Sequence, residues 1–406
     1  AGVFQFRTDN SNQISFYTNP DAKLRAYISG SYTGDLTTPR KMRDFAAWYH
    51  VVATIDTTNA TAGDRLRLYI NGERQTDFST ETYPSQNTSF APIVSGEFQL
   101  GKYSATDRAC YLAHVHYCDG YAYNADSFGS TDATTGEWKI NTAPSVNYGS
   151  NGVFLKFANS GSMGADSSGN GNNMSVSGTI LQTQDCPSNN FAVLNPIINP
   201  DVGNRATYSV GNLKGNTNSA GHISGLSTFG VNEGKFYCES KSGSSGSGHV
   251  FGVLDAERYI GATDPQDFSG FYGVAGNGTR YVAGTQTGSW GGSYTYNNVM
   301  GLALDMDASP PKLHIHYNGS YCNGSGAYNQ TFDNSVPITL AADKTYLFYF
   351  GDNTSSGTYD HQVNFGNGHF GTTAISSEGT NASGFGKFEY DVPANFTALC
   401  TKGLNE

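Results

Sequence analysis

The chain has 406 residues, a length at which two domains are the default expectation. Its formal net charge is −11 and only 14% of its residues are charged, which argues against nucleic-acid binding, because phosphate contacts require clustered Lys and Arg. No apolar run approaches the ~18 residues of a membrane span, so no membrane insertion is expected.

Short strand-like runs follow one another from Val3 onward, with turn residues between them. The clearest are two alternating runs, Trp48–Asp56 and Leu66–Ile70, which end on the turn Asn71-Gly72. Period-two alternation that is bounded by Asn-Gly is a strong indication of antiparallel strands. The other strands expected in this half are Gln13–Tyr17, Leu24–Ser29, Glu97–Gly101, Cys110–Tyr117 and Val153–Phe157.

Residues 181–200 interrupt this pattern with three prolines and no alternation. They are predicted to link a first domain at 1–180 to a second at 201–392, which a less regular tail follows at 393–406. Many short strands with regular turns predict β-sandwiches or barrels. Strand-like runs of the second domain are Gly234–Ser240, Val250–Leu254, Tyr272–Ala275, Met300–Asp305, Leu313–Tyr317, Thr345–Phe350 and Gln362–Phe365.

One loop of the first domain offers oxygen ligands at alternate positions, with glycines between them. Asp166, Ser168, Asn170 and Asn172 are of the chemical type that Ca²⁺ prefers. The loop lacks the further carboxylates and the closing Glu of an EF-hand loop. A Ca²⁺ site and an Asx-rich turn before a strand at Met174–Gly178 both remain open interpretations.

Residues 271–296 of the second domain are rich in aromatic and amide side chains. Aromatic faces stack on the C–H surfaces of sugars, and amides bond hydroxyls, but such rings also build cores. The region is therefore either core or a recognition loop. Its candidate ligand-binding residues are Tyr272, Tyr281, Trp290, Tyr294 and Tyr296.

Signs of catalysis are weak. Acidic residues alternate at Asp305 and Asp307 and at Glu389 and Asp391. A retaining glycosidase needs two carboxylates about 5–5.5 Å apart. Turn hydrogen bonding explains the first pair better, and a solvated face explains the second better. The chain is expected not to be an enzyme.

Two histidine pairs also alternate, His114 with His116 and His314 with His316, but no third metal ligand follows at a telling spacing. Hydrogen-bonded or solvated histidines are expected. The six cysteines show no metal-binding spacing and are expected to be free thiols, which suits assembly in a reducing cytoplasm. No cofactor is implied beyond the open Ca²⁺ interpretation.

The first domain resembles the concanavalin-A-like, laminin-G-like domains of tailed phages, especially marine ones. In that family the opening strands precede the point that corresponds to Ala1, so the chain is expected to be a processed or truncated product. The matching segments are Phe45–His50, Leu68–Gly72, Leu112–Val115, Ser127–Gly129, Thr134–Trp138 and Asp166–Asn173.

The second domain resembles a SPRY-type sandwich. The matching segments are Gly234–Glu239, Gly301–Asp307, His316–Gly319 and Val363–Gly366. The end of the chain, Phe388–Pro393 followed by Ala398–Lys402, is similar to the close of the same phage proteins. Together the two resemblances imply an all-β chain of two antiparallel β-sandwiches in tandem, a concanavalin-A-like jelly roll and then a SPRY-like sandwich.

The resemblance also implies a role. It predicts a non-enzymatic virion protein of a tail fibre or other fibre-like appendage, which is assembled in the host cytoplasm and binds a host-surface glycan or receptor. Other virion proteins are expected partners, and the fibre analogy implies a homotrimer. The alternatives are a purely structural spacer or decoration, and a glycan-cleaving tailspike-like enzyme. Fold alone does not decide among them.

Overall fold

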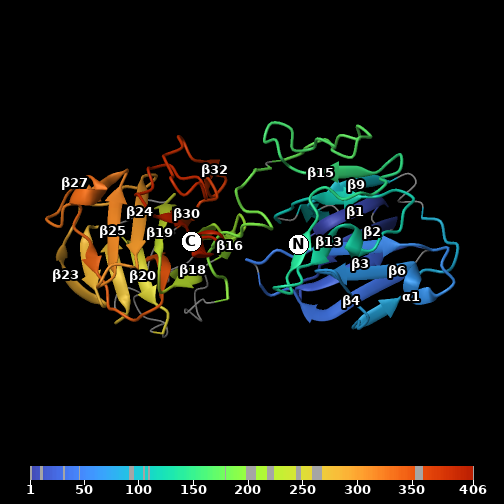
Figure 1. Ribbon diagram of the computed structural model, residues 1–406, viewed down its shortest axis with the longest axis horizontal. Coiled ribbons are helices and arrows are strands. Elements are labelled where there is room, and N and C mark those ends of the chain that lie inside the picture. The colour runs from blue at the N-terminus through green and yellow to red at the C-terminus, as the bar shows by residue number, and fades with distance from the viewer. Residues whose placement is uncertain are drawn as a thin grey trace. The chain divides into compact units, whose positions relative to one another are not determined.

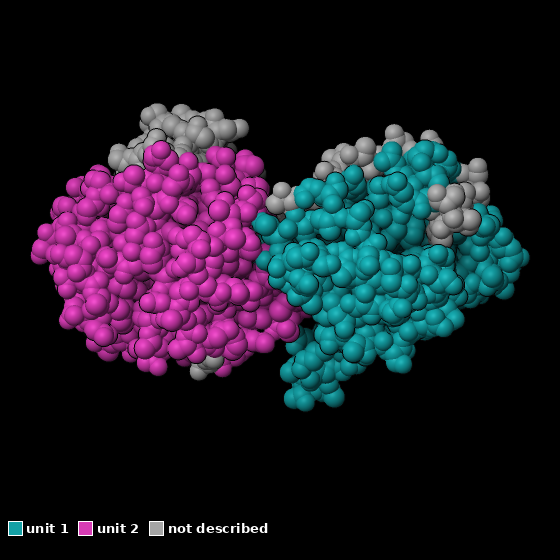
Figure 2. All heavy atoms as spheres, turned by 90° about the horizontal axis from the view of Figure 1, so that it is seen from above, with its two compact units in different colours: residues 1–182 teal, residues 183–406 magenta. Residues whose placement is uncertain are grey.

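Figure 1 presents the chain as a computed structural model. Its regular structure is almost entirely β, as predicted. The chain divides into two compact units, residues 1–182 and 183–406, which Figure 2 colours separately. The structure describes residues 2–9, 12–30, 33–44, 46–90, 96–103, 106–107, 110–178, 180–197, 207–216, 224–243, 248–257, 268–352 and 360–405.

A six-stranded and a three-stranded antiparallel sheet form the first unit. The larger sheet has the order β8-β4-β3-β2-β1-β9 and the smaller has β5-β6-β7. Ile14, Phe16 and Leu36 of the larger sheet share one buried core with Leu66 and Leu68 of the smaller. The bounds are β1 (Gly2–Asp9), β2 (Asn12–Thr18), β3 (Lys23–Ile28), β4 (Gly34–Lys41), β5 (Val51–Ile55), β6 (Leu66–Ile70), β7 (Glu73–Arg74), β8 (Thr80–Thr82) and β9 (Glu97–Leu100).

Three two-stranded pairs and two short helices complete this unit. The pairs join β10 with β11, β12 with β15, and β13 with β14. Helix α1 lies between β5 and β6, and η1 precedes β13. The bounds are β10 (Lys102–Tyr103), β11 (Thr106–Asp107), β12 (Val115–Tyr117), β13 (Gly129–Thr131), β14 (Trp138–Ile140), β15 (Val153–Leu155), α1 (Ala62–Arg65) and η1 (Ala125–Ser127).

The predicted antiparallel strands and the turn at Asn71-Gly72 are confirmed. Strands β5 and β6 pair antiparallel from Val51↔Ile70 to Ile55↔Leu66, and the turn joins β6 to β7 in a hairpin with the pairs Ile70↔Glu73 and Tyr69↔Arg74. Asn71 and Gly72 both have positive φ, at 48° and 82°, as a tight hairpin turn requires. A Cβ on Gly72 would lie 2.2 Å from the Trp138 ring, so both the turn and its packing favour glycine there.

The second unit contains a ten-stranded and a six-stranded sheet. The larger has the path β16-β17-β30-β19-β24-β25-β26-β27, with β28 beside β25 and β33 beside β19. Its bounds are β16 (Thr207–Ser209), β17 (Lys214–Asn216), β19 (Lys235–Lys241), β24 (Val299–Asp305), β25 (Lys312–Tyr317), β26 (Ser320–Cys322), β27 (Tyr328–Gln330), β28 (Ile338–Thr339), β30 (Asp360–Asn364) and β33 (Thr397–Ala398).

The six-stranded sheet has the order β18-β29-β20-β21-β22-β23. A small pair, β31 with β32, and the helices η3 and η4 accompany the two sheets. The bounds are β18 (Ser224–Val231), β20 (His249–Asp255), β21 (Phe271–Ala275), β22 (Thr279–Val282), β23 (Thr285–Ser289), β29 (Tyr346–Asp352), β31 (His369–Phe370), β32 (Thr373–Ala374), η3 (Phe332–Asn334) and η4 (Gly403–Asn405).

The segment that was predicted to be a linker belongs largely to the second unit. The boundary between the two units falls after Gln182, so nearly all of the segment lies in the second unit. Its residues Phe191 and Leu194 are buried. Isolated bridges join Phe191 to Cys400 and Leu194 to Ser227. The apolar run between the prolines therefore packs without forming a regular strand. Residues 198–200 of the predicted linker lie outside the described residues.

Part of the predicted tail at 393–406 likewise packs into the core. Strand β33 pairs in parallel with β19, and Ala398, Leu399 and Cys400 are fully buried. The sequence did not predict this packing, because β33 has only two residues and so shows no apolar-polar alternation. All six cysteines are free thiols. Among the described residues, no helix is long and apolar enough to cross a membrane.

Candidate functional site

Residues 119–124, here called the aromatic loop, carry an open aromatic pair in the first unit. Tyr121 is 46% exposed, and its ring stacks on that of Tyr123, with centroids 5.8 Å apart and planes 14° apart. Among the described residues, the exposed large aromatic side chains are Tyr121 and Tyr296. A flat, accessible ring pair is a surface on which a ligand with an apolar face can stack.

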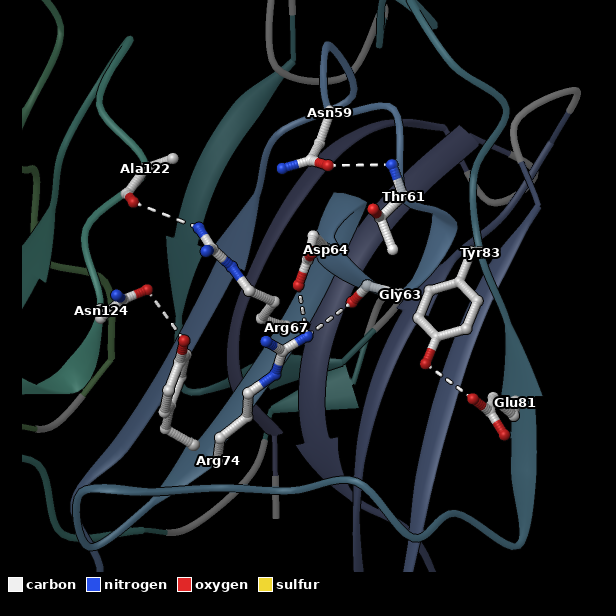
Figure 3. Close-up of polar contacts among 11 residues, drawn as sticks. Asn59, Thr61, Gly63, Asp64, Arg67, Arg74, Glu81, Tyr83, Ala122 and Asn124 are labelled. Carbon is white, nitrogen blue, oxygen red and sulfur yellow. Dashed lines mark hydrogen bonds and ion pairs between the residues drawn. The ribbon is translucent and has the colours of Figure 1, made fainter.

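Side chains of the smaller sheet form hydrogen bonds to the aromatic loop. The Thr54 hydroxyl donates to the carbonyl of Tyr123 at 2.6 Å. Arg67, which is the cross-strand partner of Thr54, donates to the carbonyl of Ala122 at 3.2 Å (Figure 3). The Tyr69 hydroxyl donates to the Asn124 side-chain oxygen at 2.8 Å. Alternation along β5 and β6 turns these three side chains away from the core, so the strands pre-organise the loop.

Residues 147–152, here called the amide loop, hold the same rings from the side. The side-chain amide of Asn147 donates to the Tyr121 hydroxyl at 2.7 Å. Its backbone N–H donates to the Tyr123 hydroxyl at 2.9 Å, and its side-chain oxygen accepts from Gly149 N at 2.9 Å. One residue therefore fixes both hydroxyls while the ring faces stay available.

The predicted Ca²⁺ loop, residues 166–173, is an Asx-rich turn centred on Asp166. One carboxylate oxygen accepts from the backbone N–H groups of Phe154 and Ser168 at 2.9 and 2.8 Å. The other accepts from the Ser168 hydroxyl at 2.8 Å and from Asn172 N at 2.9 Å. Partial burial acts to raise the pKa of Asp166, but these hydrogen bonds outweigh it and the pKa is lowered.

The asparagines of this turn reach the amide loop. Asn170 donates to the carbonyls of Gly149 and Gly152 at 2.7 and 3.0 Å. Asn172 donates to those of Ser150 and Gly152, both at 3.0 Å. The asparagine side chains predicted as Ca²⁺ ligands thus join the Asx-rich turn to the amide loop. Within the described ranges no group of three or more His, Cys, Asp or Glu could hold a metal ion. The hydrogen bonds of Asp166, Asn170 and Asn172 support the interpretation as an Asx-rich turn.

The aromatic, amide and Asx-rich loops together form what we call the three-loop surface. Sequence analysis did not identify Tyr121 and Tyr123 as site residues. The available signal was Asp119-Gly120-Tyr121-Ala122-Tyr123, where alternating tyrosines follow a turn dipeptide. Such a pattern does not tell which ring faces stay uncovered.

Four of the five aromatic residues predicted for recognition in the second unit are instead buried. Tyr272, Tyr281, Trp290 and Tyr294 belong to the core, which removes their faces from ligand contact. The Tyr294 hydroxyl accepts from Ser242 N and donates to the Asn298 carbonyl. Tyr296 is 47% exposed and remains available.

The alternating acidic and histidine pairs have structural partners. Asp305 accepts from the backbone N–H groups of Asp307 and Ala308 in the turn after β24, as the turn interpretation predicts. His114 precedes β12 with φ of 49°, so it does not share a strand face with His116, contrary to expectation. His116 is hydrogen-bonded to the Tyr148 hydroxyl at 2.9 Å.

His316 belongs to a fully buried polar network of the second unit. Gly319 N donates to its Nδ1 at 3.0 Å, so the neutral ring carries its hydrogen on Nε2. Nε2 lies 2.6 Å from the Tyr237 hydroxyl, which then donates to Glu239 at 3.0 Å. Burial lowers the pKa of His316 to about 3, in keeping with a neutral ring.

Glu239 fastens the C-terminal segment to β19. Its carboxylate accepts from the backbone N–H groups of Glu389 and Tyr390 at 2.9 and 2.8 Å and from the Asn364 amide at 3.2 Å. Burial raises the pKa of Glu239 to about 7, while these hydrogen bonds oppose the rise. Because Glu239, Tyr237 and His316 are all enclosed, the network meets no substrate and acts as a structural fastening.

Ser242 and His249 form a second buried polar pair, with the Ser242 hydroxyl 2.9 Å from His249 Nε2. His361 Nε2 lies 2.7 Å from the carbonyl of Gly351 and 3.4 Å from His249 Nδ1. All three side chains are buried in the second unit.

Comparison with known proteins gives the relationships of the chain. Residues 1–109 match the family described as the concanavalin A-like lectin/glucanases superfamily. No curated protein matches the chain. A solved structure, that of the SPRY domain of human HERC1, is similar with a TM-score of 0.32 and 17% sequence identity, and the match covers 42% of this chain and 96% of that one.

Proposed function

We propose that the protein is a non-enzymatic glycan-binding protein and that the three-loop surface is its binding site. The observation that carries this proposal is the stacked pair of the exposed Tyr121 and the partly buried Tyr123, whose hydroxyls both accept hydrogen bonds from Asn147. A ring pair that is rigid before binding loses little conformational entropy when a sugar stacks on it.

Binding is favoured over cleavage because the carboxylates of this surface are engaged. Asp166 accepts four hydrogen bonds within its turn, and Asp119 accepts from the Asn151 amide at 2.8 Å. A retaining glycosidase needs a nucleophilic carboxylate and an acid facing one sugar bond. Groups that hold loops together are poorly placed for either role.

For the biological setting, we propose a tail fibre or other fibre-like appendage of a phage particle, with a host-surface glycan as ligand. Other virion proteins and further copies of the chain would be its partners. The support is the resemblance of both halves to such proteins. A purely structural spacer is the alternative, and it would tolerate the loss of Tyr121.

The test compares Tyr121→Ala with Tyr296→Ala, since these two tyrosines are almost equally exposed in different units. Both variants and the wild-type chain are titrated with oligosaccharides from the host surface by calorimetry. We expect Tyr121→Ala to weaken binding at least about tenfold, because the stacking surface is lost, and Tyr296→Ala to leave it unchanged. The reverse result would move the site to the second unit, and release of reducing ends by the wild type would indicate an enzyme.

A further inference from the structure

Arg67 places a positive charge beneath the aromatic loop. It lies on β6, faces away from the core and is half-buried. Its terminal nitrogen donates to the carbonyl of Ala122, the residue between the two stacked tyrosines, at 3.2 Å (Figure 3). The guanidinium is therefore bonded to the backbone of the aromatic loop, between its two tyrosines.

The hydrogen-bonding capacity of Arg67 is largely unused. A guanidinium carries five N–H donors, and Arg67 spends one of them on Ala122. Its Nε is buried and has no hydrogen-bond partner among the described residues. Because Nε is buried, the donors that remain for a ligand are the three other N–H groups of the two terminal nitrogens.

Three other arginines of the same unit have more partners than Arg67. Arg74 pairs with Asp64 at 2.6 Å, and Arg25 pairs with Asp35 at 2.5 Å. Arg65 donates to the carbonyls of Asn59, Ala60 and Pro84. In the part of the chain that the structure describes, no carboxylate lies within ion-pair distance of Arg67, although acidic residues outnumber basic ones, 34 to 23.

We infer that Arg67 binds the carboxylate of an acidic sugar, such as a uronic or sialic acid residue, whose ring stacks on Tyr121. The inference rests on the proposed function and names the class of glycan. A planar guanidinium matches a carboxylate with two parallel N–H···O hydrogen bonds, which fixes the orientation of the sugar as well as its affinity.

The overall charge of the protein does not prevent this. A net charge of −11 repels an anion at long range, but that field is screened beyond about 8 Å at physiological ionic strength. At the site itself, contact with Arg67 therefore decides whether an acidic or a neutral sugar is preferred.

The test uses matched pairs of oligosaccharides: three uronate series (gluco, galacto and manno) and sialyllactose, each with its carboxyl-reduced counterpart. Dissociation constants are measured on the full chain for wild type, Arg67→Gln, Arg67→Lys and Arg74→Gln. We expect wild type to prefer the acidic member of the pair that it binds by at least about tenfold, about 1.4 kcal/mol. Arg67→Gln should lose that preference, so that both members of the pair bind with equal affinity, and loss of the hydrogen bond to the Ala122 carbonyl should weaken the two members alike.

The other variants control for charge and folding. Arg74→Gln removes a cation of the same sheet that Asp64 already neutralises, so the preference should persist. Arg67→Lys keeps the positive charge but lacks the planar guanidinium, so it should retain part of the preference for the acidic sugar. Equal wild-type affinity for both members, or a preference that survives in Arg67→Gln with an unchanged melting temperature, overturns the inference. Neutral sugars that bind and depend on Tyr121 would leave the proposed function standing, whereas no binding of any sugar would count against that function.

Discussion

Asn147 bonds both tyrosines of the aromatic loop, with its side-chain amide 2.7 Å from the Tyr121 hydroxyl and its backbone nitrogen 2.9 Å from that of Tyr123. The hydroxyls of the pair are thereby occupied by the protein itself. What the pair presents outward is ring surface, which is the part that a sugar face contacts. The relationship makes the site rigid, and it also makes the site dependent on one amide.

Replacement of Asn147 by Ala should weaken glycan binding without unfolding the protein. The variant loses the side-chain donor to Tyr121, worth about 1 kcal/mol, so we expect roughly a fivefold loss of affinity. Hydrogen exchange of residues 119–124 should accelerate at the same time. Asn141→Ala is the matched control, since that side chain accepts only from Ala143 N and leaves the aromatic loop untouched. Slow, unchanged exchange in Asn147→Ala would mean that β5 and β6 hold the loop alone.

The Asx-rich turn gives a prediction about metal. Because Asp166 already accepts four hydrogen bonds, we expect neither Ca²⁺ nor EDTA to shift the melting temperature of the first unit. Asp166→Ala should instead destabilise that unit by roughly 1–3 kcal/mol in chemical denaturation, since several donors lose their acceptor. Asp126→Ala, an exposed carboxylate on η1, serves as the control. Heat of Ca²⁺ binding in calorimetry that disappears in Asp166→Ala would restore the Ca²⁺ interpretation.

Buried Glu239 should make the second unit less stable as pH rises. Its pKa is raised by burial to about 7, whereas the unfolded chain titrates near 4.5, so between these values the folded state holds the extra proton. Stability that is fully present below about pH 4.5 is then lost up to about pH 7, by a few kcal/mol.

The measurement compares wild type with Glu239→Gln by denaturant unfolding at pH 5, 6, 7 and 8. Other groups titrate in both proteins, so the difference between the two profiles isolates Glu239. The free energy of unfolding of wild type should fall relative to that of the variant from pH 5 to pH 7 and then run parallel to it. Parallel profiles over the whole range would show that the four hydrogen bonds to Glu239 keep it ionised.

Local pattern predicted the strands better than it predicted exposure. The alternation in Leu66–Ile70 suffices to predict β6, because its first, third and fifth residues are apolar and all lie in the buried core. Whether Tyr121 or Tyr294 is covered depends instead on distant segments. Thr54 reaches Tyr123 across 69 residues, and Tyr69 reaches Asn124 across 55, so no local pattern could reveal the aromatic loop. The packing of residues 191–194 against Cys400 was hidden for the same reason.

The requirement for glycine in the hairpin turn at Asn71-Gly72 can be tested by substituting two glycines. Gly72 and Gly136 both have positive φ, at 82° and 72°, so alanine at either position carries the same backbone strain of about 1 kcal/mol. A Cβ at Gly72 would also meet the Trp138 ring at 2.2 Å, whereas one at Gly136 would meet nothing within 4 Å. We therefore expect Gly72→Ala to cost the first unit about 1–3 kcal/mol more than Gly136→Ala in denaturant unfolding. Trp138 also donates to His50 Nδ1 at 3.0 Å, so its tryptophan fluorescence should change in Gly72→Ala and not in Gly136→Ala. Equal losses would mean that Trp138 moves aside at no cost and that the turn conformation alone requires glycine.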